Sequence, residues 1–335
     1  MCVMRSLFTF WIFWFSLPIS AASVRCDLQI LNQALASFDS LLGNHPMLWQ
    51  SSFTLDGKPL SREPLSSIER GEALIEATFS SQDLRNEILA GVGLGGPSPD
   101  LRRFFSIYPY AYDRAIHAID GYLESALAVC KNVSLDGRIL DLGSLTGTTS
   151  ALCLQYPAGN SRTMVAIDQS REALAVAQNK LALASGNQPY RFEISLGDVA
   201  DSVHYQRPFT SAIMLNVAYL LDDEKMDTVF QEVGIGLPSG GTFVLVDVRS
   251  DALSEAGLLK WLKANARNMV RNGGRATEFD TVFMGAMNYV NVLTPGRTFP
   301  RLASDFIRFG QKHGLHLKEL RTINFQGANL YVFRK

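Results

Sequence analysis

From residue 137 onward, short apolar runs typical of β-strands alternate with stretches that have helical spacing. The strand-like runs are RILDLGS, TMVAIDQ, YRFEISLGD, SAIMLNVAY and GTFVLVDV, and the helix-like stretches are TTSALCLQY, REALAVAQNKLALASG and DDEKMDTVFQEVGIGL. Strands that alternate with helices of this length form right-handed βαβ units and a mostly parallel sheet. The chain ends in HLKELRTIN and ANLYVFRK, which indicate a hairpin at the sheet edge. This pattern predicts an α/β domain over residues 131–335.

The preceding region, residues 26–130, has a different pattern. Apolar residues recur there at helical spacing, as in DLQILNQALASFDSLLG and SIERGEALIEATF, and turn-rich breaks such as DGKPLSREP and GGPSPD separate these stretches. β-branched residues are few. We therefore expect a helical cap that forms the substrate region, and we expect its last helix to run through YAYDRAIHAIDGYLESALAVC.

The first 25 residues have the layout of a secretory signal peptide. Arg5 precedes an apolar run over residues 7–19, and the small residues 20–23 follow it. This run is shorter than the ~20 residues of a membrane-spanning helix, although it would still serve as a signal anchor. We expect residues 1–25 to be a signal peptide or membrane anchor, so that the chain is exported or membrane-associated. A buried or amphipathic helix in a cytoplasmic protein is the alternative.

The charge balance and the cysteine pattern argue against several classes of function. The chain has 31 basic and 32 acidic side chains and a formal net charge of −1, so we expect no nucleic-acid partner. The four cysteines, Cys2, Cys26, Cys130 and Cys153, contain no CxxC pair, and the five histidines are scattered. We therefore predict neither a metal site nor a disulfide framework.

Polar residues and glycines follow the first two predicted strands at their carboxyl ends, where open parallel sheets bind ligands. Asp141 leads into a turn whose Gly143 and Gly147 let the backbone approach a ligand closely. Asp168 ends the second strand, where a carboxylate can accept hydrogen bonds from both hydroxyls of a ribose. Alone, each feature is also explained by a helix cap or an ordinary turn.

The next two predicted strands end in the same way. Asp198 follows the third strand, where a carboxylate would accept a hydrogen bond from the exocyclic amine of adenine, and Asn216 follows the fourth. Such residues at the correct end of consecutive strands predict one ligand site along this edge of the sheet.

These motifs resemble those of the class I S-adenosylmethionine-dependent methyltransferases over residues 137–335. ILDLGSLTG is similar to the DxGxGxG motif of that family, VAIDQS to its acidic second motif, LGDVAD to the third and SAIMLNVAYLLDD to the fourth. LPSGGTFVLVDV resembles its proline-glycine-glycine turn and fifth strand, and GRTFPRLASDFIRFGQKHGL more loosely resembles a segment of small-molecule O-methyltransferases. The resemblance implies an α/β, Rossmann-like fold with a seven-stranded, mostly parallel sheet, an antiparallel terminal strand and an N-terminal helical cap.

The resemblance also implies S-adenosyl-L-methionine as the methyl donor. It distributes six residues around that cofactor: Gly143 and Gly147 beside the methionine moiety, Asp141 at the loop or the amino group, Asp168 at the ribose hydroxyls, Asp198 at the adenine amine, and Asn216 between cofactor and acceptor. One departure is Leu145, which occupies the position of the middle glycine. A leucine there needs negative φ or accepts strain, and it would crowd the cofactor.

We therefore expect a methyltransferase that acts on an oxygen or another nucleophile of a small-molecule acceptor. Leu145 and the absence of histidine from residues 249–300 favour the alternative, a catalytically inactive binding or scaffold protein with the same fold. An NAD-dependent oxidoreductase would share the strand-end acid but not the PSGG turn or the terminal hairpin. Asp222, Tyr219 and Tyr289 are candidate pocket residues with an equally good structural explanation, so no catalytic residue is assigned.

The signal-like segment must also be reconciled with a methyl donor that is made in the cytosol. A membrane anchor over residues 7–19, with the catalytic domain facing the cytosol, satisfies both requirements. Delivery of the protein into another cell and a start site downstream of Met1 are the alternatives.

Overall fold

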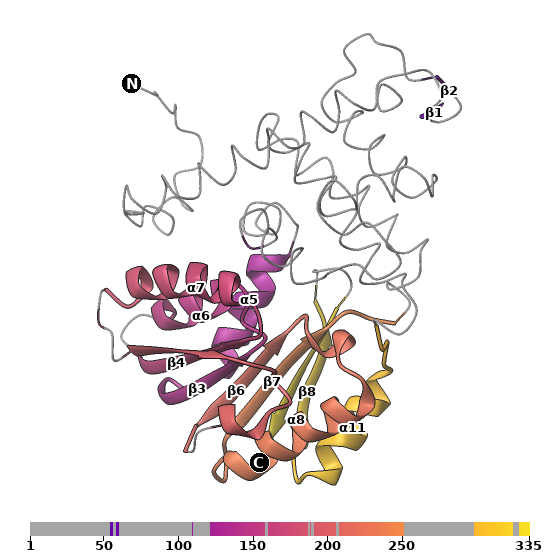
Figure 1. Cartoon of the computed structure of the whole chain (residues 1–335). Coiled ribbons are helices and arrows are strands. Elements are labelled where there is room, and N and C mark those ends of the chain that lie inside the picture. The colour runs from indigo at the N-terminus through magenta and orange to yellow at the C-terminus, as the bar shows by residue number, and fades with distance from the viewer. Residues whose placement is uncertain are drawn as a thin grey trace.

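The computed structural model describes residues 54–55, 58–59, 109, 121–157, 160–186, 188, 191–205, 208–250, 298–323 and 328–335. Most of these residues form one seven-stranded sheet with helices on both of its faces (Figure 1). Its strands are β3 (Asp136–Leu142), β4 (Ser161–Asp168), β5 (Phe192–Leu196), β6 (Ser211–Leu215), β7 (Thr242–Asp247), β8 (His316–Thr322) and β9 (Asn329–Arg334). The helices are α5 (Tyr122–Asn132), α6 (Thr148–Gln155), α7 (Arg171–Ala184), α8 (Asp223–Gly236) and α11 (Ala303–Lys312), with short 3₁₀ turns η4 (Ser202–His204) and η5 (Ala218–Leu220).

The strand order across the sheet is β5-β4-β3-β6-β7-β9-β8. Neighbouring strands from β5 to β7 pair in parallel, whereas β9 pairs antiparallel with both β7 and β8. The predicted Rossmann-like sheet of seven strands, mostly parallel and with an antiparallel terminal strand, is therefore confirmed. Because β3 lies between β4 and β6, the chain changes direction across the sheet there, and a ligand crevice forms at such a point in open α/β sheets.

The two faces of the sheet carry different helices. Helices α5, α6 and α7 cover one face, and α8 and α11 cover the other (Figure 1). On the second face Phe230 of α8 stacks on Phe309 of α11 at a ring-centroid distance of 5.6 Å, and it meets the edges of Phe243 and Phe333 at 5.3 and 5.5 Å. Aromatic contacts thus fix both helices on β7 and β9.

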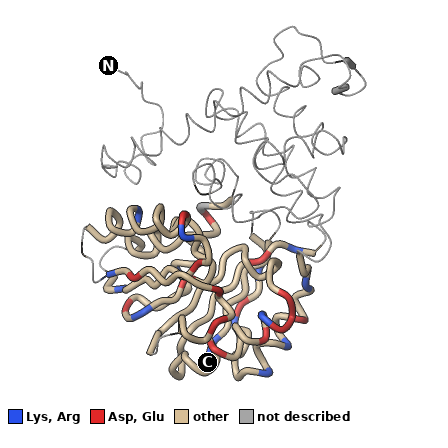
Figure 2. Tube along the Cα trace, viewed as in Figure 1, with Lys and Arg blue, Asp and Glu red and all other residues tan. Residues whose placement is uncertain are grey.

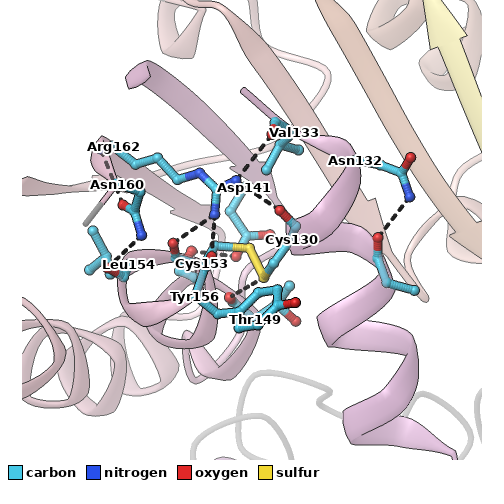
Figure 3. Close-up of a disulfide and its surroundings, with 12 residues drawn as sticks. Cys130, Asn132, Val133, Asp141, Thr149, Cys153, Leu154, Tyr156, Asn160 and Arg162 are labelled. Atoms are coloured by element: carbon cyan, nitrogen blue, oxygen red, sulfur yellow. Dashed lines mark hydrogen bonds between the residues drawn. A yellow bond between two sulfur atoms is a disulfide. The ribbon is translucent and has the colours of Figure 1, made fainter. Parts of the chain in front are cut away.

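A disulfide between Cys130 and Cys153 joins α5 to α6, with the two Cα atoms 4.9 Å apart (Figure 3). This bond corrects the prediction from the cysteine pattern. The two residues are separated by 23 positions, and they meet only because α5 lies beside α6. Helix α5 also packs against β7 and β9.

Arg162 is fully buried beside this disulfide (Figure 3). Its guanidinium donates five hydrogen bonds to backbone carbonyls, those of Cys130, Val133, Ser134, Cys153 and Tyr156. These carbonyls lie at the carboxyl ends of α5 and α6, where the helix dipole attracts a positive charge. One side chain of β4 therefore holds the ends of both helices.

Several expectations fall outside the described residues. Residues 1–25 do so entirely, as does the segment 251–297 with Tyr289. Of residues 26–120, the structure describes the antiparallel pair β1 (Thr54–Leu55) and β2 (Lys58–Pro59) together with Pro109. The helical cap and the division at residues 25 and 130 stay predictions. No helix in the described part of the chain is both long and apolar enough to cross a membrane.

Candidate functional site

Five polar residues lie at the carboxyl ends of five neighbouring strands. Across the sheet from β5 to β7, they are Asp198, Asp168, Asp141, Asn216 and Asp247. Because these strands are parallel, their carboxyl ends share one edge of the sheet. The structure thus brings the strand-end residues that the sequence singled out to one edge, and it adds Asp247.

The loop between β3 and α6 turns back over the end of β4. The backbone N–H groups of Gly143 and Ser144 both donate to the carbonyl of Ile167 at 2.9 Å. Gly143 and Gly147 have φ angles of 78° and 70°, in the left-handed region. A Cβ on Gly143 would lie 2.5 Å from Cγ2 of Val217, which no side chain tolerates. Glycine is therefore required at this position both by backbone conformation and by space.

Leu145 has a left-handed backbone conformation, which is strained for a residue with a side chain. Its φ is 46°, and its N–H donates to Oδ2 of Asp168 at 2.9 Å. A left-handed conformation costs a residue with a Cβ about 1–2 kcal/mol. A hydrogen bond to a charged group contributes a similar amount, so Asp168 offsets the strain at Leu145.

Asp168 connects the loop to the start of α7. Its Oδ1 accepts from the N–H of Ser170 at 2.9 Å. Burial raises the pKa of Asp168, and the bonds from the N–H groups of Ser170 and Leu145 oppose this rise. The N–H of Gln169 also bonds to this carboxylate, so the ribose hydroxyls would share its remaining acceptor capacity. The ribose contact itself stays a prediction.

Asp141 lies behind the loop and is 2 % exposed. Its Oδ2 accepts from the hydroxyl of Ser150 in α6 at 2.5 Å. Burial raises the pKa of Asp141 to about 7; the charge of Asp168 adds to this rise and the bond from Ser150 opposes it. The contact joins the end of β3 to α6. The role of Asp141 in orienting the loop stays a prediction.

Asp198 already has a cationic partner that the sequence did not indicate. Lys225 of α8 donates to its Oδ2 at 2.6 Å, and the N–H of Ala200 donates to its Oδ1 at 2.9 Å. Burial alone would raise the pKa of Asp198, but these bonds outweigh it and lower the pKa. An adenine amine at this position would share the carboxylate with Lys225.

Asn216 has a φ of 62°, and its N–H donates to the carbonyl of Val246 at 2.8 Å. Its Oδ1 is buried and finds no hydrogen-bond partner within the described residues. The same holds there for Oγ of Ser144 and Oδ2 of Asp247. These three unsatisfied atoms belong to residues at the ends of β3, β6 and β7, as expected of a site that binds a polar ligand.

Two of the other candidate pocket residues have structural roles. Asp222 caps the start of α8, where its carboxylate accepts from the N–H of Lys225 at 2.8 Å. The N–H of Tyr219 donates to Oδ1 of Asp247 at 3.2 Å. Asp247 was missed although its signal was present: it is the acidic residue that ends the apolar run FVLVD.

Substitution Gly143→Ala is expected to lower the free energy of unfolding by about 2 kcal/mol or more, since the left-handed conformation and the contact with Val217 both become unfavourable. Gly240→Ala is the matched control, because Gly240 has a φ of 81° but nothing within 4 Å of a built Cβ. In chemical denaturation, Gly240→Ala should lower the free energy of unfolding by the conformational cost alone. Introduced into a Val217→Ala background and compared with Val217→Ala alone, Gly143→Ala should cost less than it does in the native chain. Equal losses for Gly143→Ala and the control would contradict this account.

Comparison with known proteins finds a match to a methyltransferase domain and solved structures with a similar fold. A family model described as a methyltransferase domain matches residues 139–241, from β3 to the turn before β7. A candidate O-methyltransferase from Nostoc punctiforme has a similar structure, with 12% identity over 88% of this chain and 83% of that chain and a TM-score of 0.50. A magnesium protoporphyrin IX methyltransferase from Synechocystis, with bound S-adenosylhomocysteine, is 13% identical over 78% of this chain and 98% of that chain, with a TM-score of 0.41. No curated protein matches the chain.

Proposed function

Because the chain carries a methyltransferase domain with the class I methyltransferase fold, we propose that it is an S-adenosyl-L-methionine-dependent methyltransferase that methylates an oxygen or another nucleophile of a small molecule. The observation that carries this proposal is the loop of residues 143–147, which is bonded to the strand-end carboxylate of Asp168. A glycine turn opening into a helix beside a strand-end acid is the arrangement that binds nucleosides in this class of sheet.

The described residues fit this cofactor in three respects. The glycine at 143 lets the loop turn tightly against Val217, Asp168 keeps acceptor capacity for a ribose, and Asn216 has a buried acceptor atom without a partner in the described part of the chain. When bound, the cofactor supplies an electrophilic methyl group on a sulfonium. The protein's own task is then to bind and orient the two reactants and to exclude water.

The charge distribution supports a small molecule as the acceptor. The chain has 31 basic and 32 acidic side chains, and both signs are interspersed over the described trace (Figure 2). A nucleic acid would be bound by a basic face. We therefore propose that the methyl acceptor is a small polar molecule and not a nucleic acid.

Methyl transfer can be tested with methyl-tritiated S-adenosyl-L-methionine and a panel of small hydroxyl- and amine-bearing molecules added to the full chain. We expect tritium in extracted small-molecule product. Binding of S-adenosylhomocysteine without transfer to any acceptor would favour the inactive binding protein, to which the position of Leu145 in the loop also points. Binding of NAD without binding of either sulfur compound would favour an oxidoreductase.

For localisation, we propose that residues 1–25 direct the chain out of the cytosol or anchor it in a membrane. The Cys130–Cys153 disulfide supports export, because disulfides persist in oxidising compartments and are rare in the cytosol. An anchored domain that faces the cytosol, where the methyl donor is made, would instead keep both thiols reduced.

Alkylation of the protein in its native host distinguishes these two cases. In an exported protein, Cys130 and Cys153 should resist iodoacetamide under denaturing conditions until a reductant is added. Peptide mass mapping reports each cysteine separately, so Cys2 and Cys26 do not confuse the result. Full alkylation of Cys130 and Cys153 without reductant would favour the domain that faces the cytosol.

A further inference from the structure

Asp247 is a buried acid that the proposed cofactor contacts do not use. It ends β7, whose six residues are all buried, and it is itself 2 % exposed. The N–H of Asn216 donates to the carbonyl of Val246, the residue before Asp247. This bond continues the parallel register of β6 and β7 by one residue, so Asn216 lies alongside Asp247 at the edge of the sheet.

The two side chains present unsatisfied hydrogen-bond acceptors. Oδ1 of Asp247 accepts from the N–H of Tyr219 at 3.2 Å, whereas its Oδ2 and the Oδ1 of Asn216 have no partner in the described part of the chain. A buried polar atom without a partner costs about 1–3 kcal/mol. Neighbouring acceptors are best satisfied by a ligand that carries an N–H or O–H donor.

The groups around Asp247 leave its charge incompletely compensated. Burial raises the pKa of Asp247 to about 7, and the N–H of Tyr219, the charge of Arg301 and the N–H of Val248 oppose the rise. The Arg301 guanidinium donates to Oδ1 of Asp223 at 2.7 Å and to the carbonyls of Ala218 and Leu221 at 2.9 and 2.7 Å. Its hydrogen bonds are thus directed to other groups.

Two tyrosines also interact with the charge of Asp247, and the charge of Arg249 acts on the second of them, Tyr331. Burial raises the pKa of Tyr219, which follows β6, and of Tyr331 in β9, and the charge of Asp247 adds to both shifts. Both phenols are therefore neutral at physiological pH. Asp247 is the group among these that can change its charge near neutral pH.

The order of the strand ends indicates what lies beside Asp247. In the proposed site, Asp198 contacts adenine, Asp168 contacts ribose and the loop contacts methionine, which follow one another from β5 to β3. The next strands in the sheet are β6 and β7. The methyl group and its acceptor therefore come next along the same edge, at Asn216 and Asp247.

We propose that Asp247 and Asn216 bind the nucleophilic group of the methyl acceptor, that this group is a hydroxyl or an amine with a hydrogen to donate, and that Asp247 accepts its proton. This inference rests on the proposed function. As the oxygen or nitrogen forms its bond to the methyl carbon, the methyl–sulfur bond breaks and its electron pair stays on sulfur. The proton of the hydroxyl or amine moves to Oδ2 of Asp247, which makes Asp247 a catalytic residue. An acceptor that attacks through a carboxylate has no such proton and is disfavoured here.

The proposal can be tested with phenol, aniline and benzoate as ring-matched probes of the full chain saturated with S-adenosylhomocysteine. Phenol and aniline should bind, as detected by ligand-observed NMR, and benzoate should bind at least about tenfold more weakly, since a buried carboxylate repels an anion. The affinity for phenol should rise between pH 6 and pH 8, because the carboxylate that accepts its hydrogen bond forms as the pH rises through the pKa of Asp247, about 7.

Asp247→Asn keeps the shape and one acceptor of this side chain but removes its charge. We expect it to weaken phenol binding about tenfold at pH 8 and to abolish the pH dependence, with unchanged affinity for S-adenosylhomocysteine. Asp136→Asn, at the other end of β3, is the control and should change neither. Equal binding of benzoate, no binding of phenol or aniline, or an unchanged pH dependence in Asp247→Asn would overturn the inference. Failure of S-adenosylhomocysteine itself to bind would instead contradict the proposed function.

Discussion

Substitution Asp168→Ala is expected to weaken the binding of S-adenosyl-L-methionine about 1,000-fold. Two hydrogen bonds from ribose hydroxyls to a carboxylate contribute about 1.5–3 kcal/mol each, and about 4 kcal/mol corresponds to this loss. The substitution also removes the acceptor for the N–H of Leu145, whose φ of 46° then lacks its compensating bond. Both effects act on the same site, so isothermal titration calorimetry should detect little or no binding.

Two further variants make the Asp168 result specific. Asp168→Asn retains one oxygen but cannot accept from Leu145, Ser170 and two hydroxyls together, so its affinity should also fall by a large factor. Asp136→Ala removes an exposed acid at the opposite end of β3 and should bind the cofactor normally. Normal affinity in a folded Asp168→Ala variant would remove the ribose contact from the account.

Substitution Arg162→Met is expected to lower the free energy of unfolding by at least about 4 kcal/mol. The guanidinium satisfies five backbone carbonyls, and each buried acceptor left without a partner costs about 1–3 kcal/mol. A methionine fills much of the volume but donates nothing. Loss of these hydrogen bonds should also loosen α6, the helix that follows the loop of residues 143–147.

Urea denaturation of Arg162→Met and of a matched arginine variant isolates this effect. Arg138 of β3 forms a partly exposed ion pair with Glu193, at 2.6 Å, so Arg138→Met should cost only up to about 1 kcal/mol. Arg162→Lys retains the charge with three donors, and its loss should be intermediate. If Arg162→Met does not yield folded protein, Arg162→Lys supplies the measurement. A loss below about 1 kcal/mol in Arg162→Lys would show that the carbonyls find other partners.

The features that could be predicted from the sequence are those coded by neighbouring residues. The apolar runs of β3, β4, β6 and β7 and the turns after them stand out, because a strand buried on both faces reads as a continuous apolar segment. Asp168 ends such a segment, and Gly143 and Gly147 lie in the turn after another. Their places at the edge of the sheet follow from the parallel topology alone.

The features that were missed depend on residues distant in the chain. Cys130 meets Cys153 only after α5 packs on α6, and Lys225 reaches Asp198 from 27 positions away. Arg162 lies in β4, and no residue near it in the sequence indicates that its side chain is buried and bonded to the ends of two helices. Asp247 ends an apolar run as Asp168 does, but its importance depends on the unsatisfied Asn216 beside it.

The central claim, that the strand-end site binds the methyl donor, is tested most directly by calorimetric titration of the full chain with S-adenosyl-L-methionine, S-adenosylhomocysteine and NAD. The account predicts micromolar, one-to-one binding of both sulfur compounds and no binding of NAD. Circular dichroism of the same sample establishes that the protein is folded. A folded protein that binds neither sulfur compound, or that binds NAD instead, would contradict the account.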